Sequence, residues 1–287
     1  MHHFGRFDES ALRPHPRYAG HGDGYAEAEL VAPQTGSVHT GLSIGQLAPN
    51  GSLHPHVHAF EEGFYVLAGR GAVAIDDRSY LVGPGDYGAL KVGTPHAWCN
   101  AGEAPVRWLQ MAAPQPRPHG SARDTFFLKN TMLPSPTQPP SAPRPAEHLL
   151  GHFDVGQIPT GDEGRIASGG LRGVFLKWMI DETFGARHHR MLFIEYQPGV
   201  SIGLHDHTFE EAYYILSGEV EATLDGSKYL AGPGHVIWTG VGCVHAFANA
   251  GGEPVRWLET FSPQPPAENV FRFIAEWEQR ARELEGQ

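Results

Sequence analysis

Short runs of apolar residues, interrupted by glycine and proline, recur along the whole chain. From Val38 to Leu47, apolar positions alternate loosely with small or polar ones, which is the period of a half-buried strand. Further runs of this kind span 64–67, 72–75, 79–82, 96–100 and 106–111. Asp76-Asp77 lies between two of them and predicts a hairpin. Short strands with a turn about every 8–12 residues favour an all-β sandwich or barrel.

The second half of the chain repeats this pattern at an offset of 149 residues. Gly83-Pro84-Gly85 returns as Gly232-Pro233-Gly234, and Arg107-Trp108 returns as Arg256-Trp257. The register holds without a gap from residue 3 to residue 116. Self-similarity over this length indicates a tandem duplication of one domain.

The repeat predicts four parts, namely an N-terminal barrel over 1–116, a proline-rich linker over 117–148, a C-terminal barrel over 149–265 and a tail over 266–287. Within the linker, the apolar stretch Phe126-Phe127-Leu128 is expected to dock on a barrel. In the tail, apolar residues between Val270 and Leu284 follow helical spacing. We therefore expect a C-terminal amphipathic helix that covers a barrel or packs in a subunit contact.

Composition narrows the class of protein. The 36 glycines and 24 prolines favour a turn-rich β fold over a helix bundle. A net charge of -11 gives no basic footprint for nucleic acid, and no apolar run reaches the roughly 18 residues of a membrane span. Cys99 and Cys243 form neither a disulfide framework nor a Cys-x-x-Cys zinc site. Because no signal peptide is recognised, we expect a cytoplasmic protein.

The candidate chemistry lies in the stretch His56-Val57-His58-Ala59-Phe60-Glu61-Glu62. In a strand, residues i, i+2 and i+6 point to one side, so His56, His58 and Glu62 share a face and Glu61 points away. His96 is the candidate fourth ligand. The offset of 149 residues reproduces the whole set as His205, His207, Glu211 and His245.

Three imidazoles and one carboxylate that converge on a point suit a divalent transition metal. Fe, Mn, Ni, Co and Cu remain open, while Zn is less expected because it prefers four-coordinate sites. The duplication allows up to two ions in each chain. Four protein ligands on an octahedral ion leave two positions for substrate or O2. We identify no catalytic residue beyond the ligands and no organic cofactor.

A simpler interpretation is that these histidines are surface residues in a chain with 18 histidines. The duplicate with identical spacing makes that interpretation far less favourable. His54, His188 and His189 have no histidine at the symmetric position and keep the simpler interpretation. Glu61 and Glu210 are expected to face outward or to lie between the barrels, and Asn100 and Asn249 to fix turns.

The two cavities need not be equivalent. At the offset of 149 residues, Ala89 corresponds to Trp238 and Phe64 to Tyr213. Phe64 and Tyr213 share the parity of the ligand glutamates and are expected to line the cavities. If Trp238 also points inward, the second cavity is smaller and more polar than the first, and a larger second cavity contradicts this hypothesis.

These motifs resemble the cupin superfamily, whose first motif is Gly-x5-His-x-His-x3,4-Glu-x6-Gly. The second half matches it in full, whereas in the first half the leading glycine, Gly51, is one residue too close. The second family motif, Gly-x5-Pro-x-Gly-x2-His-x3-Asn, matches both halves except for its proline, which is replaced by Lys91 and Gly240. The resemblance implies two tandem jelly-roll barrels, also called double-stranded β-helices, in one chain: a bicupin.

The resemblance implies a metal-dependent enzyme, and most directly an oxidoreductase of the dioxygenase type. Its substrate would be a small organic molecule that chelates the metal, with O2 as the second reactant. A Mn-dependent bicupin decarboxylase similar to oxalate decarboxylase is one alternative, and a hydrolase similar to ureidoglycine aminohydrolase is another. A non-catalytic cupin that binds a small molecule is the alternative from a different class. Homo-oligomerisation through the tail is compatible with the sequence.

Overall fold

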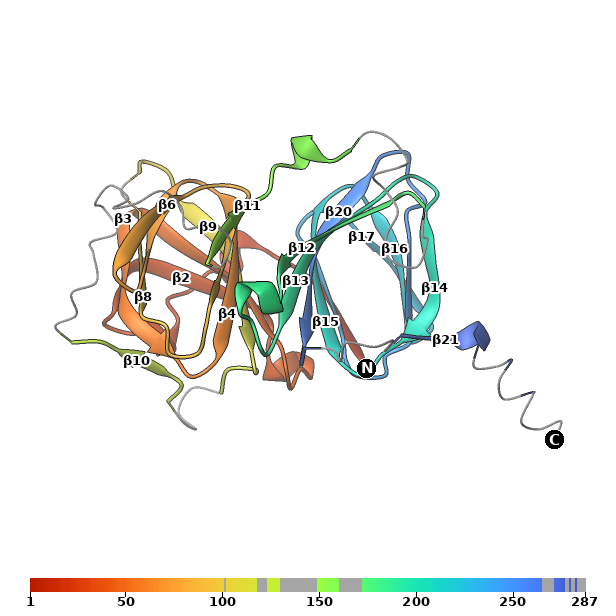
Figure 1. Cartoon of the computed structure of the whole chain (residues 1–287), viewed down its shortest axis with the longest axis horizontal. Helices are drawn as coiled ribbons and strands as arrows, with labels where there is room; N and C mark the ends of the chain where they lie inside the picture. The colour runs from red at the N-terminus through yellow and green to blue at the C-terminus, as the bar shows by residue number, and fades with distance from the viewer. Residues whose placement is uncertain are drawn as a thin grey trace.

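The computed structural model contains two β-barrels side by side, one built mainly from each half of the chain (Figure 1). The structure describes residues 1–100, 102–117, 123–129, 149–159, 172–264 and 271–276, together with Gln279 and Arg282. Strands dominate both halves, which confirms the prediction of two tandem all-β barrels. Among the described residues, no helix has the length and apolar character needed to cross a membrane.

A single long strand, β3, organises the first barrel. It pairs with β2, with β9 along its first half and with β8 near its end. The described sheet has the order β11-β7-β4-β9-β3-β8-β5-β6, and β2 and β10 pair with β3. Its strands are β2 (Gly22–Val31), β3 (Gly41–His58), β4 (Glu61–Ala68), β5 (Gly71–Ile75), β6 (Arg78–Val82), β7 (Asp86–Leu90), β8 (His96–Cys99), β9 (Val106–Ala113), β10 (Thr125–Phe127) and β11 (Leu150–His152).

The second barrel is built from two sheets. Their orders are β1-β18-β15-β20-β13-β12 and β17-β16-β19-β14-β21. The strands are β1 (His2–Arg6), β12 (Val174–Ile180), β13 (Arg190–Tyr196), β14 (Ser201–Asp206), β15 (Glu210–Ser217), β16 (Val220–Leu224), β17 (Ser227–Ala231), β18 (His235–Thr239), β19 (His245–Ala248), β20 (Val255–Ser262) and β21 (Arg272–Phe273). Short 3-10 turns connect strands in both halves at Glu9–Ala11, Pro16–Tyr18, Pro33–Thr35, Val155–Gln157 and Glu182–Phe184.

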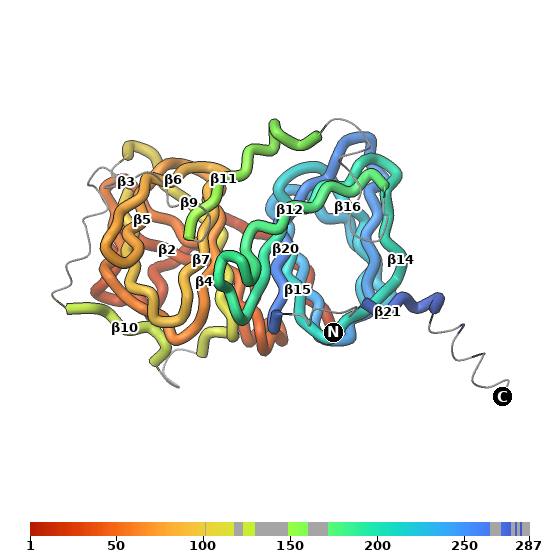
Figure 2. The backbone as a smooth tube through the Cα atoms, viewed as in Figure 1, coloured from red at the N-terminus to blue at the C-terminus, as the bar shows by residue number. Residues whose placement is uncertain are grey.

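The two halves exchange their first strands. β1 pairs with β18 of the second barrel, and β11 pairs with β7 of the first. Figures 1 and 2 show this directly, since the N-terminus lies at the second barrel and β11 lies against the first. The boundaries at 1–116 and 149–265 follow the repeat and did not include this exchange. A duplicated sequence does not indicate which copy of an edge a strand will pair with.

The barrels meet through two symmetric carboxylates. Glu61 accepts hydrogen bonds from the backbone N–H groups of Arg187 and His188. Glu210 accepts them from the backbone N–H groups of residues 38, 39 and 40, which is the equivalent loop of the other half. This confirms that both glutamates lie between the barrels. His189, interpreted as non-functional, also contacts Glu61, with Nδ1 3.3 Å from Oε2.

Three apolar clusters fill the molecule. One lies inside each barrel, and the third crosses between them, where Ile180 and Trp238 of the second half join Ile44 and Met111 of the first. Each fully buried large apolar side chain contributes about 1.5–3 kcal/mol. The shared cluster therefore holds the barrels together as one unit.

Turn residues occupy equivalent positions in the two barrels. Asp76 and Asp225 have positive φ, at 52° and 46°, in the tight turns of the β5–β6 and β16–β17 hairpins. This confirms the hairpin predicted at Asp76-Asp77. Asn100 and Asn249 fix turns as expected, because each side chain donates to the carbonyl four residues ahead and accepts from the N–H two residues ahead.

The segment that follows each barrel folds back on the strand that carries the histidines. β10 pairs with the end of β3, as expected for the apolar stretch in the linker. In the tail, β21 pairs with the end of β14, and Ile274–Glu276 then turn helical. Residues 272–273 are therefore a strand, which corrects the predicted helix there, because β14 offers an open edge and Asp206 binds Arg272 at 2.7 Å. Most of the predicted helix lies outside the described residues.

Candidate metal centres

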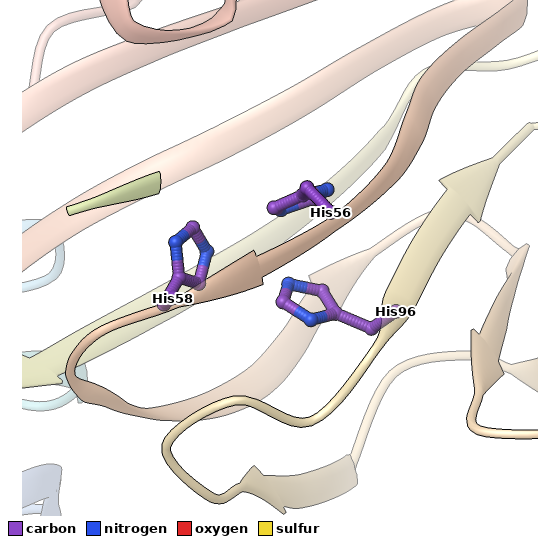
Figure 3. A group of neighbouring side chains, drawn as sticks. All are labelled: His56, His58 and His96. Atoms are coloured by element: carbon purple, nitrogen blue, oxygen red, sulfur yellow. The ribbon is translucent and has the colours of Figure 1, made fainter. Parts of the chain in front are cut away.

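The histidines of the first barrel come from two neighbouring strands. His56 and His58 end β3, and His96 begins β8 directly opposite His56. The alternation of a strand places His56 and His58 on the same face, as predicted. Their rings converge with that of His96 (Figure 3), and one ring nitrogen from each lies within 4.8 Å of the others. All three side chains are buried.

The second barrel repeats the arrangement. His205 lies on β14, His207 follows that strand, and His245 begins β19 opposite His205. One nitrogen from each ring again lies within 4.8 Å of the others, and the three side chains are buried. Both predicted sets of three histidines are therefore brought together by the fold.

Backbone carbonyls fix the orientation of five of these six rings. The Nδ1 atoms of His56, His96, His205, His207 and His245 lie 2.6–2.9 Å from the carbonyl oxygens of His54, Thr94, Gly203, Phe209 and Cys243. A carbonyl oxygen only accepts, so each Nδ1 carries the proton. The lone pair of Nε2 is then free to bind a metal, which is the support that metal-binding imidazoles use.

His58 is held differently. Its Nδ1 lies 2.9 Å from the hydroxyl of Thr125 on β10, outside the repeated part of the sequence. The Thr125 hydroxyl in turn lies 3.4 Å from Oδ1 of Asp124 and donates to it. The Thr125 oxygen can therefore accept from His58 Nδ1, which again leaves Nε2 free.

The inward nitrogens fit a metal ion. The Nε2 atoms of His58 and His96 are buried and make no hydrogen bond within the described part of the chain. A buried polar atom without a partner is costly, and a divalent cation coordinated by three imidazoles removes that cost. Both groups of three histidines therefore fit a divalent metal.

Burial controls protonation in the first group. Desolvation lowers the pKa of His56, His58 and His96, so the rings are neutral, as metal ligands must be. Desolvation also raises the pKa of Glu62 to about 7. The carboxylate of Glu62 lies 3.3 Å from His58 Nε2. Its role as a fourth ligand stays a prediction.

An ion pair dominates the second group. Glu211 lies 2.8 Å from His207 Nε2 and 3.3 Å from His245 Nε2, and it accepts a hydrogen bond from Tyr213. Burial acts to raise the pKa of Glu211, but the charge of His207 and its hydrogen bond hold it below the usual range. The same pair raises the pKa of His207 against the effect of burial. Glu211 as a metal ligand likewise stays a prediction.

The cavities contradict the predicted difference between the barrels. The cavity that Glu62 borders measures about 390 Å³, and the cavity that His205 and Glu211 border measures about 570 Å³, so the second is the larger. It is also the more apolar, because its wall is mainly aromatic and aliphatic, whereas Arg17, Glu27 and Gln110 border the first.

The reason lies in the direction of Trp238. Thr239 pairs with Glu211 and faces the barrel interior, so the preceding Trp238 points out between the barrels. There its Nε1 donates to Glu210 at 3.3 Å. Tyr213 lines the second cavity as expected, but Phe64 does not line the first and packs on Trp98 with ring centroids 4.9 Å apart.

Three aromatic residues near the centres were missed. The ring of Tyr18 lies 5.6 Å from that of His56, and the rings of Phe271 and Phe273 lie 5.6 and 5.5 Å from that of His205. All three lie outside the strands that carry the histidines. The apolar character of the tail was the one signal that pointed to the two phenylalanines.

Two tandem barrels, each with three histidines that converge in its interior, define a bicupin. The model of the cupin domain matches residues 43–111 and 192–261, one stretch in each barrel. Each half of the chain therefore contains a cupin domain.

Solved structures of bicupins share the whole fold. The formate complex of oxalate decarboxylase from Lactobacillus farciminis matches with a TM-score of 0.67 at 17% identity, over 96% of this chain and 90% of that one. Oxalate decarboxylase from Bacillus subtilis at pH 4.6 matches with a TM-score of 0.63 at 19% identity, over 99% and 82%. A further structure of the Bacillus subtilis enzyme, concerned with its Mn(II) centres, gives 0.64 at 19% identity over 96% and 80%. No curated protein matches the sequence.

Proposed function

We propose that the chain is a metal-dependent enzyme that oxidises a small organic substrate with O2 at the centre of the second barrel, as a dioxygenase does. The observation that carries this proposal is the cavity of about 570 Å³ bordered by His205, Glu211 and Tyr213. Most of its remaining wall is apolar, which suits an organic body better than a small, fully charged ion.

The residues around the cavity would have different roles in this reaction. A divalent metal held by the Nε2 atoms of His205, His207 and His245 would polarise an oxygen donor of the substrate and exchange electrons with O2. The Tyr213 hydroxyl donates to Glu211 and lies 3.3 Å from His245 Nε2, so it holds a proton beside the metal position. The aromatic wall orients the substrate body and excludes water.

Metal analysis followed by O2 uptake tests the proposal. We expect two ions per chain and O2 consumption with a substrate from a panel of catechols and diketones. His205→Ala removes one ion and the O2 uptake, whereas His56→Ala removes the other ion. Fully folded protein without metal, or metal-loaded protein that consumes no O2 with any member of the panel, would reject the proposal.

A decarboxylase reaction in the first barrel is a second candidate. Arg17 and Glu62 both border the first cavity of about 390 Å³, and a guanidinium group favours a carboxylate substrate. The bicupins of similar fold named above are oxalate decarboxylases. Oxalate should then release CO2 without net O2 consumption, and His56→Ala should abolish this while His205→Ala does not. Oxalate left intact by the metal-loaded protein would exclude the candidate.

Hydrolysis and simple binding give different readouts from either reaction. An aminohydrolase releases ammonia and consumes no O2, and a non-catalytic binding protein turns over nothing. The proposed partners remain a small-molecule substrate and O2, without nucleic acid or membrane. Self-association through the tail is measured directly by sedimentation of the purified chain.

A further inference from the structure

Glu259 is a buried acid in the wall of the second cavity. It lies on β20 opposite Tyr213 of β15, and its side chain is only 7% exposed. Its Oε2 accepts a hydrogen bond of 2.8 Å from Nε1 of Trp257. Among the described residues, no other hydrogen bond holds this carboxylate. Glu259 therefore has accepting capacity left for a group inside the cavity.

The first barrel shows that this position does not need an acid. The equivalent residue is Gln110, and its Oε1 accepts from Nε1 of Trp108 at 2.9 Å. An amide is therefore enough for the hydrogen bond that supports the tryptophan. A carboxylate at 259 brings a second acid close to Glu211 in a buried site, which is unfavourable unless a positive group compensates it.

The rest of the wall favours a positive group on an apolar body. Three glutamates line this cavity, namely Glu211, Glu259 and Glu276. Among the residues that the structure describes, no lysine or arginine lines it. Aromatic rings attract a cation over their faces and bury apolar surface. Eight aromatic side chains line the space, among them Tyr213, Phe247, Trp257 and Phe261.

We propose that the second cavity selects a substrate with a protonated amine on an apolar body, and that Glu259 is the residue that accepts the hydrogen bond from this amine. The inference rests on the proposed function, because the amine is placed on the molecule that the second centre oxidises. The oxygen donor of the substrate faces the histidines, and the amine lies at the Glu259 end. A carboxylate at that end is rejected by like charge.

Binding of three probes of similar shape tests the assignment. The metal-loaded full-length chain is titrated in a calorimeter with 2-phenylethylamine, 2-phenylethanol and phenylacetate. The amine should bind at least about 10-fold more tightly than the alcohol, and phenylacetate should bind most weakly. Glu259→Gln, which installs the residue found in the first barrel, should weaken the amine about 10-fold and leave the alcohol within about twofold. Gln110→Glu is the matched control and should leave binding of the amine at the second cavity unchanged.

The outcomes separate the two proposals. Equal affinity of amine and alcohol, no measurable binding of the amine, or an unchanged amine affinity in Glu259→Gln overturns the role of Glu259. If the variant does not fold, the ranking of the three probes on the native chain decides alone. Amine binding that depends on Glu259, in a protein that consumes no O2, would reject the oxidation and keep the amine site.

Discussion

The two barrels keep the same histidines but surround them differently. In both, ring orientation is fixed almost entirely by backbone carbonyls, so the metal position depends little on the variable side chains. The cavities have diverged instead. Ser43, Glu27 and Gln110 of the first correspond to Leu192, Leu176 and Glu259 of the second. Duplication has thus preserved the histidines and changed the residues that line the cavity beside them.

The supports of the equivalent residues His58 and His207 differ. The Nδ1 atom of His207 is hydrogen-bonded to the carbonyl of Phe209, two residues away. The Nδ1 atom of His58 is hydrogen-bonded to the hydroxyl of Thr125, which lies 67 residues further along the chain. The first centre therefore depends on the docking of β10, and the second does not depend on the matching tail strand in this way. This asymmetry can be tested independently of any substrate.

Loss of one histidine should have the largest effect on O2 uptake and should show which barrel carries out the proposed oxidation. His205→Ala leaves two imidazoles in the second centre, so we expect one metal ion per chain and a loss of O2 uptake of more than about 100-fold, beyond what losing a supporting contact costs. His56→Ala should lose the other ion and keep most of the O2 uptake. Equal losses in the two variants would mean that the barrels do not act separately. Metal content and oxygen-electrode rates measure both.

The next largest effect should come from substituting the two carboxylates between the barrels, which should lower the free energy of unfolding. Glu210→Ala removes the acceptor shared by the backbone N–H groups of residues 38–40, which we expect to lower the free energy of unfolding by about 2–4 kcal/mol in urea. Glu61→Ala should cost slightly less, because Glu210 also binds Ser37 and Trp238. The Gln variants keep one acceptor and serve as controls. A change under about 0.5 kcal/mol would remove the assigned role of these carboxylates.

Thr125→Val should weaken metal binding at the first centre and leave the second centre unchanged. It removes the hydroxyl that holds His58 while keeping the shape of the side chain, so metal affinity at the first centre should fall by about 10–100-fold. The second centre should be unaffected, and Thr125→Ser should restore the first. Competition with a chelator, read in His205→Ala so that one centre remains, gives the affinity. An unchanged affinity would show that β10 does not position His58.

The smallest expected effect is a dependence of stability on pH. Burial acts to raise the pKa of Glu61, but hydrogen bonds from His189 and from the backbone of His188 hold it below its ordinary value. A folded-state pKa below the unfolded one adds stability above the unfolded pKa of about 4.3, and this stability is lost as the pH falls. When the pH is lowered below about 4, the thermal midpoint of Glu61→Gln should therefore fall less than that of the native chain. Parallel curves for the two proteins would contradict this.

The centres were predictable because they rest on local rules. The two-residue period of a strand places His56 with His58, and the same period separates Glu62 from Glu61. The repeat then supplied the second copy without new assumptions. That the three histidines of each barrel fit a divalent metal follows from these residues alone, while the choice of metal does not.

The cavities were not predictable because they depend on register between distant strands. Trp238 faces away from the metal because β18 pairs with β15 so that Thr239, not Trp238, lies opposite Glu211. The helical spacing of the tail was outweighed at Arg272–Phe273 by the open edge of β14 and the ion pair with Asp206. In each case, contacts between segments far apart in the sequence override the local pattern.

The exchange of β1 and β11 has a consequence for synthesis and maturation of the chain. β1 finds its partner β18 only after roughly 230 further residues have been made, and the β7 edge of the first barrel stays open until β11 follows. Each barrel takes one edge strand from the other half of the chain. The molecule should therefore unfold and refold in a single cooperative transition, and half-length fragments should find each other in solution and complement.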